Sequence, residues 1–115
     1  AFCLSISHFT PLLCLISFYS VLAVTPVQND WVAGYLPTAN ALVKKHGGRY
    51  LARTANHEQL DGDDQPSALR ILLEWPSREA ALNFMNDPEY KPHLEARTAG
   101  STSYHFLIEG KDDLI

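Results

Sequence analysis

The side chains best suited to acid–base or anion-binding chemistry are arginines, tyrosines and histidines in the second half of the chain. Tyr90, His93 and His105 are candidate proton donors or acceptors. The candidate binding residues are Arg49, Arg53, Glu74, Tyr90 and Arg97. A guanidinium binds carboxylates and enolates well because its N–H donors form a planar fork. Together these side chains predict a pocket for a small anionic or aromatic molecule.

Each of these residues also has a structural interpretation, and the sequence leaves both open. Arg49 and Glu74 are also suited to a structural ion pair between neighbouring strands, and Tyr90 is suited to pack from a helix with its hydroxyl in contact with solvent. His93 fits an exposed position, and Arg97 also complements the C-terminal end of its helix. Two functional hypotheses follow: a ligand-binding protein, or a cofactor-independent monooxygenase or isomerase that stabilises an enolate with arginine.

The sequence lacks the usual motifs for binding a metal or a cofactor. None of the five histidines stands at metal-ligand spacing from another histidine, cysteine or carboxylate on one element. Gly47-Gly48 follows a predicted helix, whereas a phosphate-binding glycine loop precedes one. Cys3 and Cys14 both lie in the first fourteen residues, so no disulfide framework holds the body of the chain. We therefore expect no metal and no cofactor.

The length and net charge of the chain limit the classes of partner that we expect. The chain has 115 residues, which is room for one domain, and its net charge is −4. That charge argues against nucleic-acid binding, which needs a basic surface. No run of Lys or Arg indicates binding to a membrane surface, and the cysteine-free body suits a reducing compartment. We expect a cytoplasmic protein.

The N-terminal region allows an alternative to the cytoplasmic location. No charged residue precedes Asp30, and the apolar stretch from Pro11 to Val27 resembles a signal-peptide core or a short membrane span. However, no Lys or Arg precedes it, and Phe18–Thr25 is needed as a strand. We predict an extension at residues 1–17 and a domain at residues 18–115. An exported or membrane-anchored protein is the alternative.

Periodicity predicts the elements of this domain. Residues 18–25, 49–57, 68–75 and 103–109 are strand-like. Asn29 or Asp30 is expected to cap a helix that Pro37 kinks or divides and Gly47-Gly48 ends. Ser77 caps a second helix, and Asp87-Pro88 begins a further helical piece. The order β-α-β-β-α-β predicts an α+β, ferredoxin-like fold: a four-stranded antiparallel sheet with helices on one face.

Alternation along the strands predicts which side chains face away from the helices. This open face is expected to carry Arg49, Leu51, Arg53, Arg70, Leu72, Glu74, His105, Leu107 and Glu109, with Leu22 and Val24 added by the first strand. The helix-facing set would then include Tyr104, Phe106 and Ile108. We also expect Arg49 opposite Glu74 and Arg53 opposite Arg70. A face that mixes leucines with charges suits a homodimer interface, and a solvated outer face is the alternative.

Three stretches carry a family resemblance. They are Gly47-Gly48-Arg49-Tyr50-Leu51-Ala52-Arg53, Glu74-Trp75-Pro76-Ser77-Arg78-Glu79-Ala80-Ala81, and Asn86-Asp87-Pro88-Glu89-Tyr90 followed by Arg97. Together they resemble family 1330 of the domains of unknown function, from about Phe18 to Gly110. The resemblance implies a ferredoxin-like fold that pairs sheet to sheet, as in the dimeric α/β-barrel superfamily, and it implies no activity. The wider superfamily includes cofactor-independent monooxygenases, muconolactone-type isomerases and haem-handling enzymes.

Overall fold

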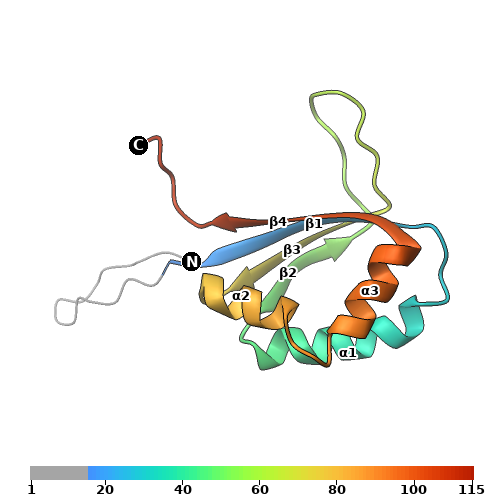
Figure 1. Ribbon diagram of the computed structural model, residues 1–115. Helices are drawn as coiled ribbons and strands as arrows, with labels where there is room; N and C mark the ends of the chain where they lie inside the picture. The colour runs from blue at the N-terminus through green and yellow to red at the C-terminus, as the bar shows by residue number, and fades with distance from the viewer. Residues whose placement is uncertain (1–15) are drawn as a thin grey trace.

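The computed structural model describes residues 16–115, which form a four-stranded sheet with three helices on one of its faces (Figure 1). The elements are β1 (Phe18–Pro26), α1 (Val32–Lys45), β2 (Arg49–Thr54), β3 (Leu69–Trp75), α2 (Arg78–Met85), α3 (Lys91–Gly100) and β4 (Ser101–Glu109). Most of the predicted N-terminal extension, residues 1–17, lies outside the described residues.

The sheet has the order β2-β3-β1-β4, and every neighbouring pair is antiparallel. The chain therefore crosses over twice through helices, once by α1 and once by α2 and α3. This arrangement confirms the predicted ferredoxin-like α+β fold. It also confirms the predicted strand at Phe18–Thr25, which the structure extends to Pro26 as β1, a central strand between β3 and β4.

Local signals explain where the helices begin and end. Ser77 caps α2, and its hydroxyl accepts a hydrogen bond from the Ala80 amide at 3.0 Å. Gly47 has φ +82°, a left-handed conformation that ends α1 at little steric cost. The prediction that Asn29 or Asp30 caps α1 was wrong, because Trp31 occupies the N-cap position without a side-chain hydrogen bond. Pro37 lies inside α1 and does not divide it, and the predicted alternative of a kink at Pro37 stays a prediction.

The core fills the space between the helices and the sheet. Its fully buried side chains include Leu22, Leu42, Leu73, Trp75 and Phe84. A Cβ on Gly48 would lie 2.6 Å from the Trp75 ring, so the chain approaches this indole closely at the end of α1. Leu22 and Val24 of β1 are buried in this core, so their side chains face the helices. The prediction that β1 adds them to the open face was wrong.

The two faces of β4 are also the reverse of the predicted ones. Tyr104, Phe106 and Ile108 lie on the open face, where they are 63%, 65% and 50% exposed. His105 and Leu107 point toward the helices instead. The cause is register: His105 is opposite Leu22 of β1, whose side chain lies in the core. Both alternating sets of side chains in β4 contain large apolar residues, so alternation alone did not show which set faces the helices.

A β-bulge reverses the second half of β2. The pairing with β3 shifts between Tyr50 and Ala52, so one residue is inserted and the following side chains change face. Arg49 lies opposite Glu74, as predicted. Arg53 lies opposite Ile71, not Arg70, and therefore on the helix side of the sheet.

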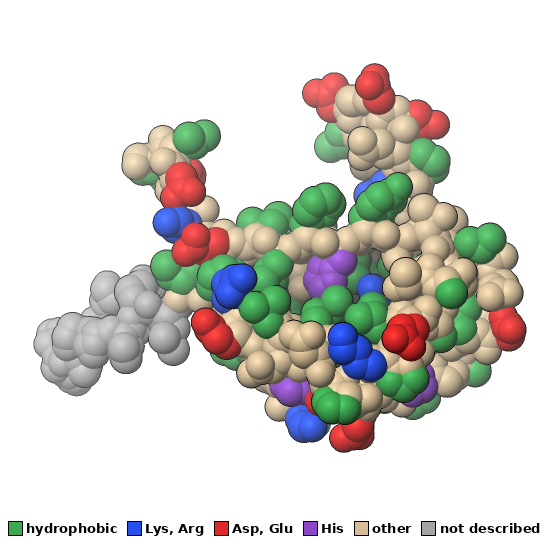
Figure 2. All heavy atoms as spheres, viewed as in Figure 1, with side chains coloured by type: hydrophobic (Ala, Val, Ile, Leu, Met, Phe, Trp, Pro, Cys, Tyr) green, Lys and Arg blue, Asp and Glu red, His purple; other side chains and the backbone are tan. Residues whose placement is uncertain are grey.

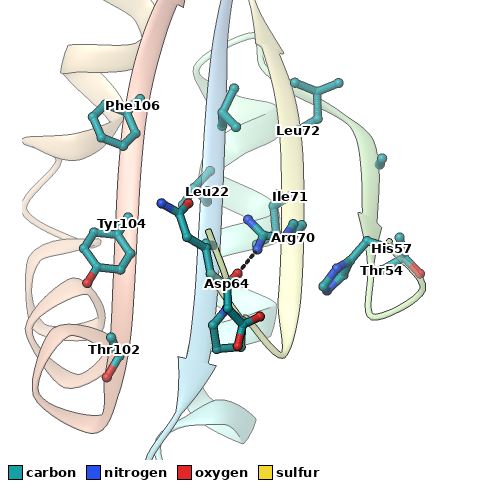
Figure 3. Close-up of a pocket in the computed structure, with 15 residues that line it drawn as sticks. Leu22, Thr54, His57, Asp64, Arg70, Ile71, Leu72, Thr102, Tyr104 and Phe106 are labelled. Atoms are coloured by element: carbon teal, nitrogen blue, oxygen red, sulfur yellow. Dashed lines mark hydrogen bonds between the residues drawn. The ribbon is translucent and has the colours of Figure 1, made fainter. Parts of the chain in front are cut away.

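The open face lies between two projecting segments. The connection between β2 and β3 rises from one end of the sheet and the C-terminal residues rise from the other (Figure 1). Hydrophobic side chains lie along the surface between them (Figure 2). The β2–β3 connection is anchored to the sheet, because Arg70 Nη2 donates a 2.6 Å hydrogen bond to the Gln65 carbonyl oxygen (Figure 3).

Candidate functional site

A cavity of about 170 Å³ lies between the helix side of the sheet and the helices α1 and α3. Most of its wall is apolar, and aromatic rings contribute a large part of it. The aromatic lining residues are Trp31, Tyr35, Tyr50, Trp75, Phe84 and Tyr90. Tyr35 packs edge-on against Trp31 with ring centroids 5.3 Å apart, and Tyr90 lies 4.2 Å from Phe84. Such a cavity suits a flat, apolar group.

Arg97 introduces a positive charge into this apolar wall. It is only 6% exposed, and its Nη1 donates to the hydroxyls of Tyr35 at 2.9 Å and Tyr90 at 3.3 Å. Its Nε is buried without a hydrogen-bond acceptor. No carboxylate within residues 16–115 forms an ion pair with it. Because a buried charge is costly unless it is paired, this guanidinium is suited to receive an anion.

The hydroxyls of Tyr35 and Tyr90 lie side by side next to Arg97. Their oxygens are 2.6 Å apart. Tyr90 is completely buried, and burial raises the pKa of its hydroxyl far above the ordinary value, with the nearby Tyr35 adding to the effect. Burial also raises the pKa of Tyr50. Tyr90 therefore keeps its proton at neutral pH, which makes it a donor and not a base.

His105 lines the same cavity from β4. Its Nε2 lies 2.7 Å from the Ser20 hydroxyl oxygen, which also accepts a 2.8 Å hydrogen bond from Trp75 Nε1. Burial lowers the pKa of His105 to about 4, and the positive charge of Arg97 acts in the same direction. The imidazole is therefore neutral at pH 7. The site thus combines a buried cation, two tyrosine hydroxyls and a neutral imidazole.

Arg53 lies at the outer edge of the cavity because of the bulge in β2. Its Nη1 donates a 2.7 Å hydrogen bond to Asn40 Oδ1 on α1, and its Cζ is 3.7 Å from the centroid of the Tyr50 ring. The side chain therefore spans from the sheet to α1 beside the cavity that it lines. Unlike Arg97, it is exposed to solvent.

The remaining predicted site residues lie elsewhere. Arg49 Nε donates to Glu74 Oε1 at 2.8 Å, an ion pair on the open face that matches the structural alternative for these residues. His93 lies on α3, and neither this histidine nor the Arg49–Glu74 pair lines the cavity. The structure thus brings together Arg53, Tyr90, Arg97 and His105 from the predicted set.

Sequence reasoning missed Tyr35 and Tyr50 as site residues. Tyr35 lies on α1 and its hydroxyl accepts a hydrogen bond from Arg97 of α3, and residue spacing within one helix does not reveal a contact with another helix. The signal available in the sequence was the tyrosine itself, since a buried tyrosine usually needs a partner for its hydroxyl.

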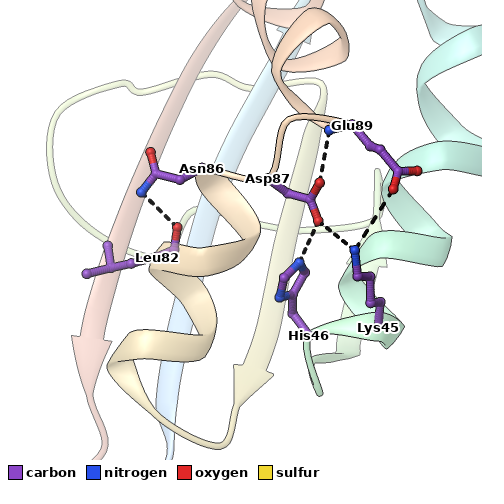
Figure 4. A network of polar contacts seen from close by, with 6 residues as sticks. All are labelled: Lys45, His46, Leu82, Asn86, Asp87 and Glu89. Atoms are coloured by element: carbon purple, nitrogen blue, oxygen red, sulfur yellow. Dashed lines mark hydrogen bonds and ion pairs between the residues drawn. The ribbon is translucent and has the colours of Figure 1, made fainter.

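A second polar cluster fastens the end of α1 to the turn before α3 (Figure 4). Asp87 Oδ2 lies 2.8 Å from His46 Nε2 and 3.2 Å from Lys45 Nζ, and Oδ1 accepts from the Glu89 amide at 2.9 Å. The hydrogen bond from His46 is the main reason that the pKa of Asp87 falls to about 2, followed by those from Glu89 and Lys45. None of these residues lines the cavity, so the cluster is structural.

A larger and shallower groove of about 1000 Å³ lies on the opposite side of the sheet (Figure 3). Leu72, Tyr104 and Phe106 line it from the strands, and His57 and Asp64 from the β2–β3 connection. Within residues 16–115 no three histidine, cysteine or acidic side chains are placed to hold a metal ion. In the same range, no helix is long and apolar enough to cross a membrane.

Comparison with known proteins identifies the family. The family model described as "Domain of unknown function (DUF1330)" matches residues 17–111. This chain is a member of the DUF1330 family. No curated protein matches it significantly. The DUF1330 match runs from Ser17, whose carbonyl oxygen accepts a hydrogen bond from the Gly110 amide, to residue 111 and so contains all four strands.

Solved structures share the DUF1330 member's fold. RPA0582 from Rhodopseudomonas palustris, described as a protein of unknown function, is 16% identical in its methylated form, with a TM-score of 0.71. That match covers 88% of this chain and 85% of RPA0582. SnoaB, a cofactor-independent oxygenase from Streptomyces nogalater, has a TM-score of 0.53 at 20% identity, covering 86% of this chain and 95% of SnoaB. These likenesses show the fold, and they agree with the predicted ferredoxin-like arrangement.

Proposed function

We propose that this protein binds a small anionic aromatic molecule in the cavity between the sheet and the helices α1 and α3. The observation that carries the proposal is Arg97, a buried guanidinium with no carboxylate partner within residues 16–115. Burying a cation without a counter-charge destabilises a fold by several kcal/mol in typical cases. A bound anion supplies the missing charge, and the aromatic wall supplies contact area for the rest of the molecule.

Tryptophan fluorescence tests this proposal, because Trp31 and Trp75 both line the cavity. A panel of aromatic acids is titrated into the wild-type protein, Arg97→Met and the control Arg78→Met. Arg78 is the matched control because it is exposed on α2 and does not line the cavity. We expect saturable quenching in the wild type and Arg78→Met, with affinity reduced at least about tenfold in Arg97→Met. Equal affinity in all three proteins would refute a role for Arg97.

We further propose that the protein is a homodimer in which the open face of each sheet covers the other. Support comes from the exposed apolar side chains on that face, above all Tyr104, Phe106 and Ile108. Sedimentation equilibrium tests this with Phe106→Lys and, as a control off this face, the exposed Val27→Lys. We expect Phe106→Lys to be monomeric and the control dimeric. A monomeric wild type at micromolar concentration would refute the proposal.

A cofactor-independent monooxygenase or isomerase is the second candidate function. It is favoured by His105, a neutral imidazole that lines the same cavity as Arg97. In this reading His105 removes a proton from a phenol or a carbon acid, and Arg97 stabilises the resulting anion. Oxygen uptake and proton exchange into deuterated water are the assays, with a panel of phenols and His105→Gln as control. Binding without turnover of any panel member would favour the ligand-binding function.

A cytoplasmic location is also part of the proposal, because the region from Asn29 onward contains no cysteine that oxidising compartments would convert to a disulfide. Fractionation of the native host tests it. Recovery in the exported fraction would instead support the alternative of a targeting signal in the N-terminal stretch.

A further inference from the structure

The size of the cavity limits the ligand to a single ring. A cavity of roughly 150 Å³ lined by apolar side chains accepts benzene. The cavity here measures about 170 Å³. The difference leaves room for one small substituent on the ring, but not for a second fused ring without displacement of the wall. The side chains that form this wall, Trp75 and Phe84 among them, are core residues that pack tightly against the helices.

The charge of the wall limits the ligand to one negative charge. Arg97 is the only buried cation among the lining residues, because His105 is neutral at pH 7. Tyr35 and Tyr90 share a hydrogen bond that keeps at least one proton between their oxygens. Arg53, the other lining cation, is exposed and already donates to Asn40. A second negative charge inside the cavity would therefore remain uncompensated.

The free edge of Arg97 favours a carboxylate. All hydrogen bonds of its guanidinium within residues 16–115 leave from Nη1, toward Tyr35 and Tyr90. The opposite edge, formed by Nε and Nη2, makes none. Two parallel N–H donors on one edge match the two oxygens of a carboxylate, and such bidentate pairs are stronger than single hydrogen bonds.

We infer that the ligand of this cavity is a single-ring aromatic monocarboxylate, held by its carboxylate on the Nε–Nη2 edge of Arg97 with its ring among the aromatic side chains. The inference rests on the proposed function and narrows its ligand class. The ring number and the charge of the ligand are each tested by separate probes, and the role of the guanidinium fork is tested by Arg97→Lys.

Isothermal titration calorimetry of the full chain at pH 7 tests the inference by measuring the affinities of four probes. Benzoate is the reference. Benzamide has the same shape without the charge, 2-naphthoate adds a ring, and phthalate adds a second carboxylate. We expect benzoate to bind most tightly, with each other probe weaker by tenfold or more. In Arg97→Met the difference between benzoate and benzamide should fall to within about twofold, and Arg97→Lys should bind benzoate less tightly than wild type because the fork is lost.

The outcomes separate this inference from the proposed function. Tighter binding of 2-naphthoate or phthalate than benzoate, with loss in Arg97→Met, would overturn the single-ring monocarboxylate and leave the anionic aromatic ligand in place. Equal binding of benzoate and benzamide by the wild type would overturn the role of charge. Saturable benzoate binding that is unchanged in Arg97→Met would overturn both, and so would the absence of binding by every probe. Circular dichroism confirms that the variants are folded.

Discussion

His105 should make the stability of this protein fall in mildly acidic solution. Burial lowers the pKa of its imidazole from 6.5 to about 4 in the folded protein, whereas the unfolded chain titrates near 6.5. Between these two values the unfolded state binds more protons than the folded state. The free energy of unfolding is therefore highest above pH 6.5 and decreases as the pH falls toward 4.

The two pKa values set the size of this effect. A difference of one pKa unit corresponds to about 1.4 kcal/mol, so the complete transition of His105 is worth about 3 kcal/mol. Most of it occurs within an accessible range, because linkage predicts a loss of about 2 kcal/mol between pH 7 and pH 5. The acidic side chains contribute little in that range, since their ordinary pKa values lie near 4.

Urea denaturation at pH 7, 6 and 5 measures this loss in the wild type and in His105→Gln. Glutamine retains a group that can bond to the Ser20 hydroxyl but does not titrate. We expect the wild type to lose about 2 kcal/mol more than the variant between pH 7 and pH 5. His57→Gln is the control, because His57 lies in the exposed β2–β3 connection. Parallel pH profiles for the wild type and His105→Gln would refute the buried, neutral imidazole.

Three further predictions test other parts of the structure. In Arg97→Met the free energy of unfolding, measured by urea denaturation, should be within about 1 kcal/mol of the wild-type value or higher, because the substitution removes an unpaired buried cation. Breaking an ordinary buried ion pair instead costs roughly 3–5 kcal/mol. Gly48→Ala should cost about 1–3 kcal/mol in urea denaturation, since its Cβ would meet the Trp75 ring at 2.6 Å. Asp87→Asn should lower the melting temperature at pH 7. It should also reduce the loss of stability between pH 4 and pH 2, because the pKa of Asp87 is near 2 and the stabilisation by its carboxylate disappears as the pH falls through that range. A melting temperature for Asp87→Asn equal to that of the wild type at pH 7 would contradict the fastening role of the cluster with His46.

The element order and the fold class were predictable from local sequence. Strand-like and helix-like periodicities, Ser77 as a cap and Gly47 as a helix end all act within a few residues of the chain, and the structure confirms them. The pairing of Arg49 with Glu74 was also predictable, because opposite charges on neighbouring antiparallel strands favour one register.

The site was only partly predictable, because it depends on which face of a strand each side chain occupies. In β4 either set of alternating residues was apolar enough for the core, and pairing with β1 decided that His105 points inward. In β2 the bulge after Tyr50 decided that Arg53 points to the helix side. The cavity likewise exists only in three dimensions, since Tyr35 and Arg97 come from helices that are far apart in sequence.

The amino-acid sequence by itself therefore determined the elements of this DUF1330 protein, their order and the presence of arginines and tyrosines able to bind an anion. Tertiary structure decided which of them act together. The physical reason is that helix and strand signals are local, whereas burial of Arg97 and the neutral state of His105 result from packing between segments more than fifty residues apart, as the hydrogen bonds to Tyr35 and Ser20 illustrate.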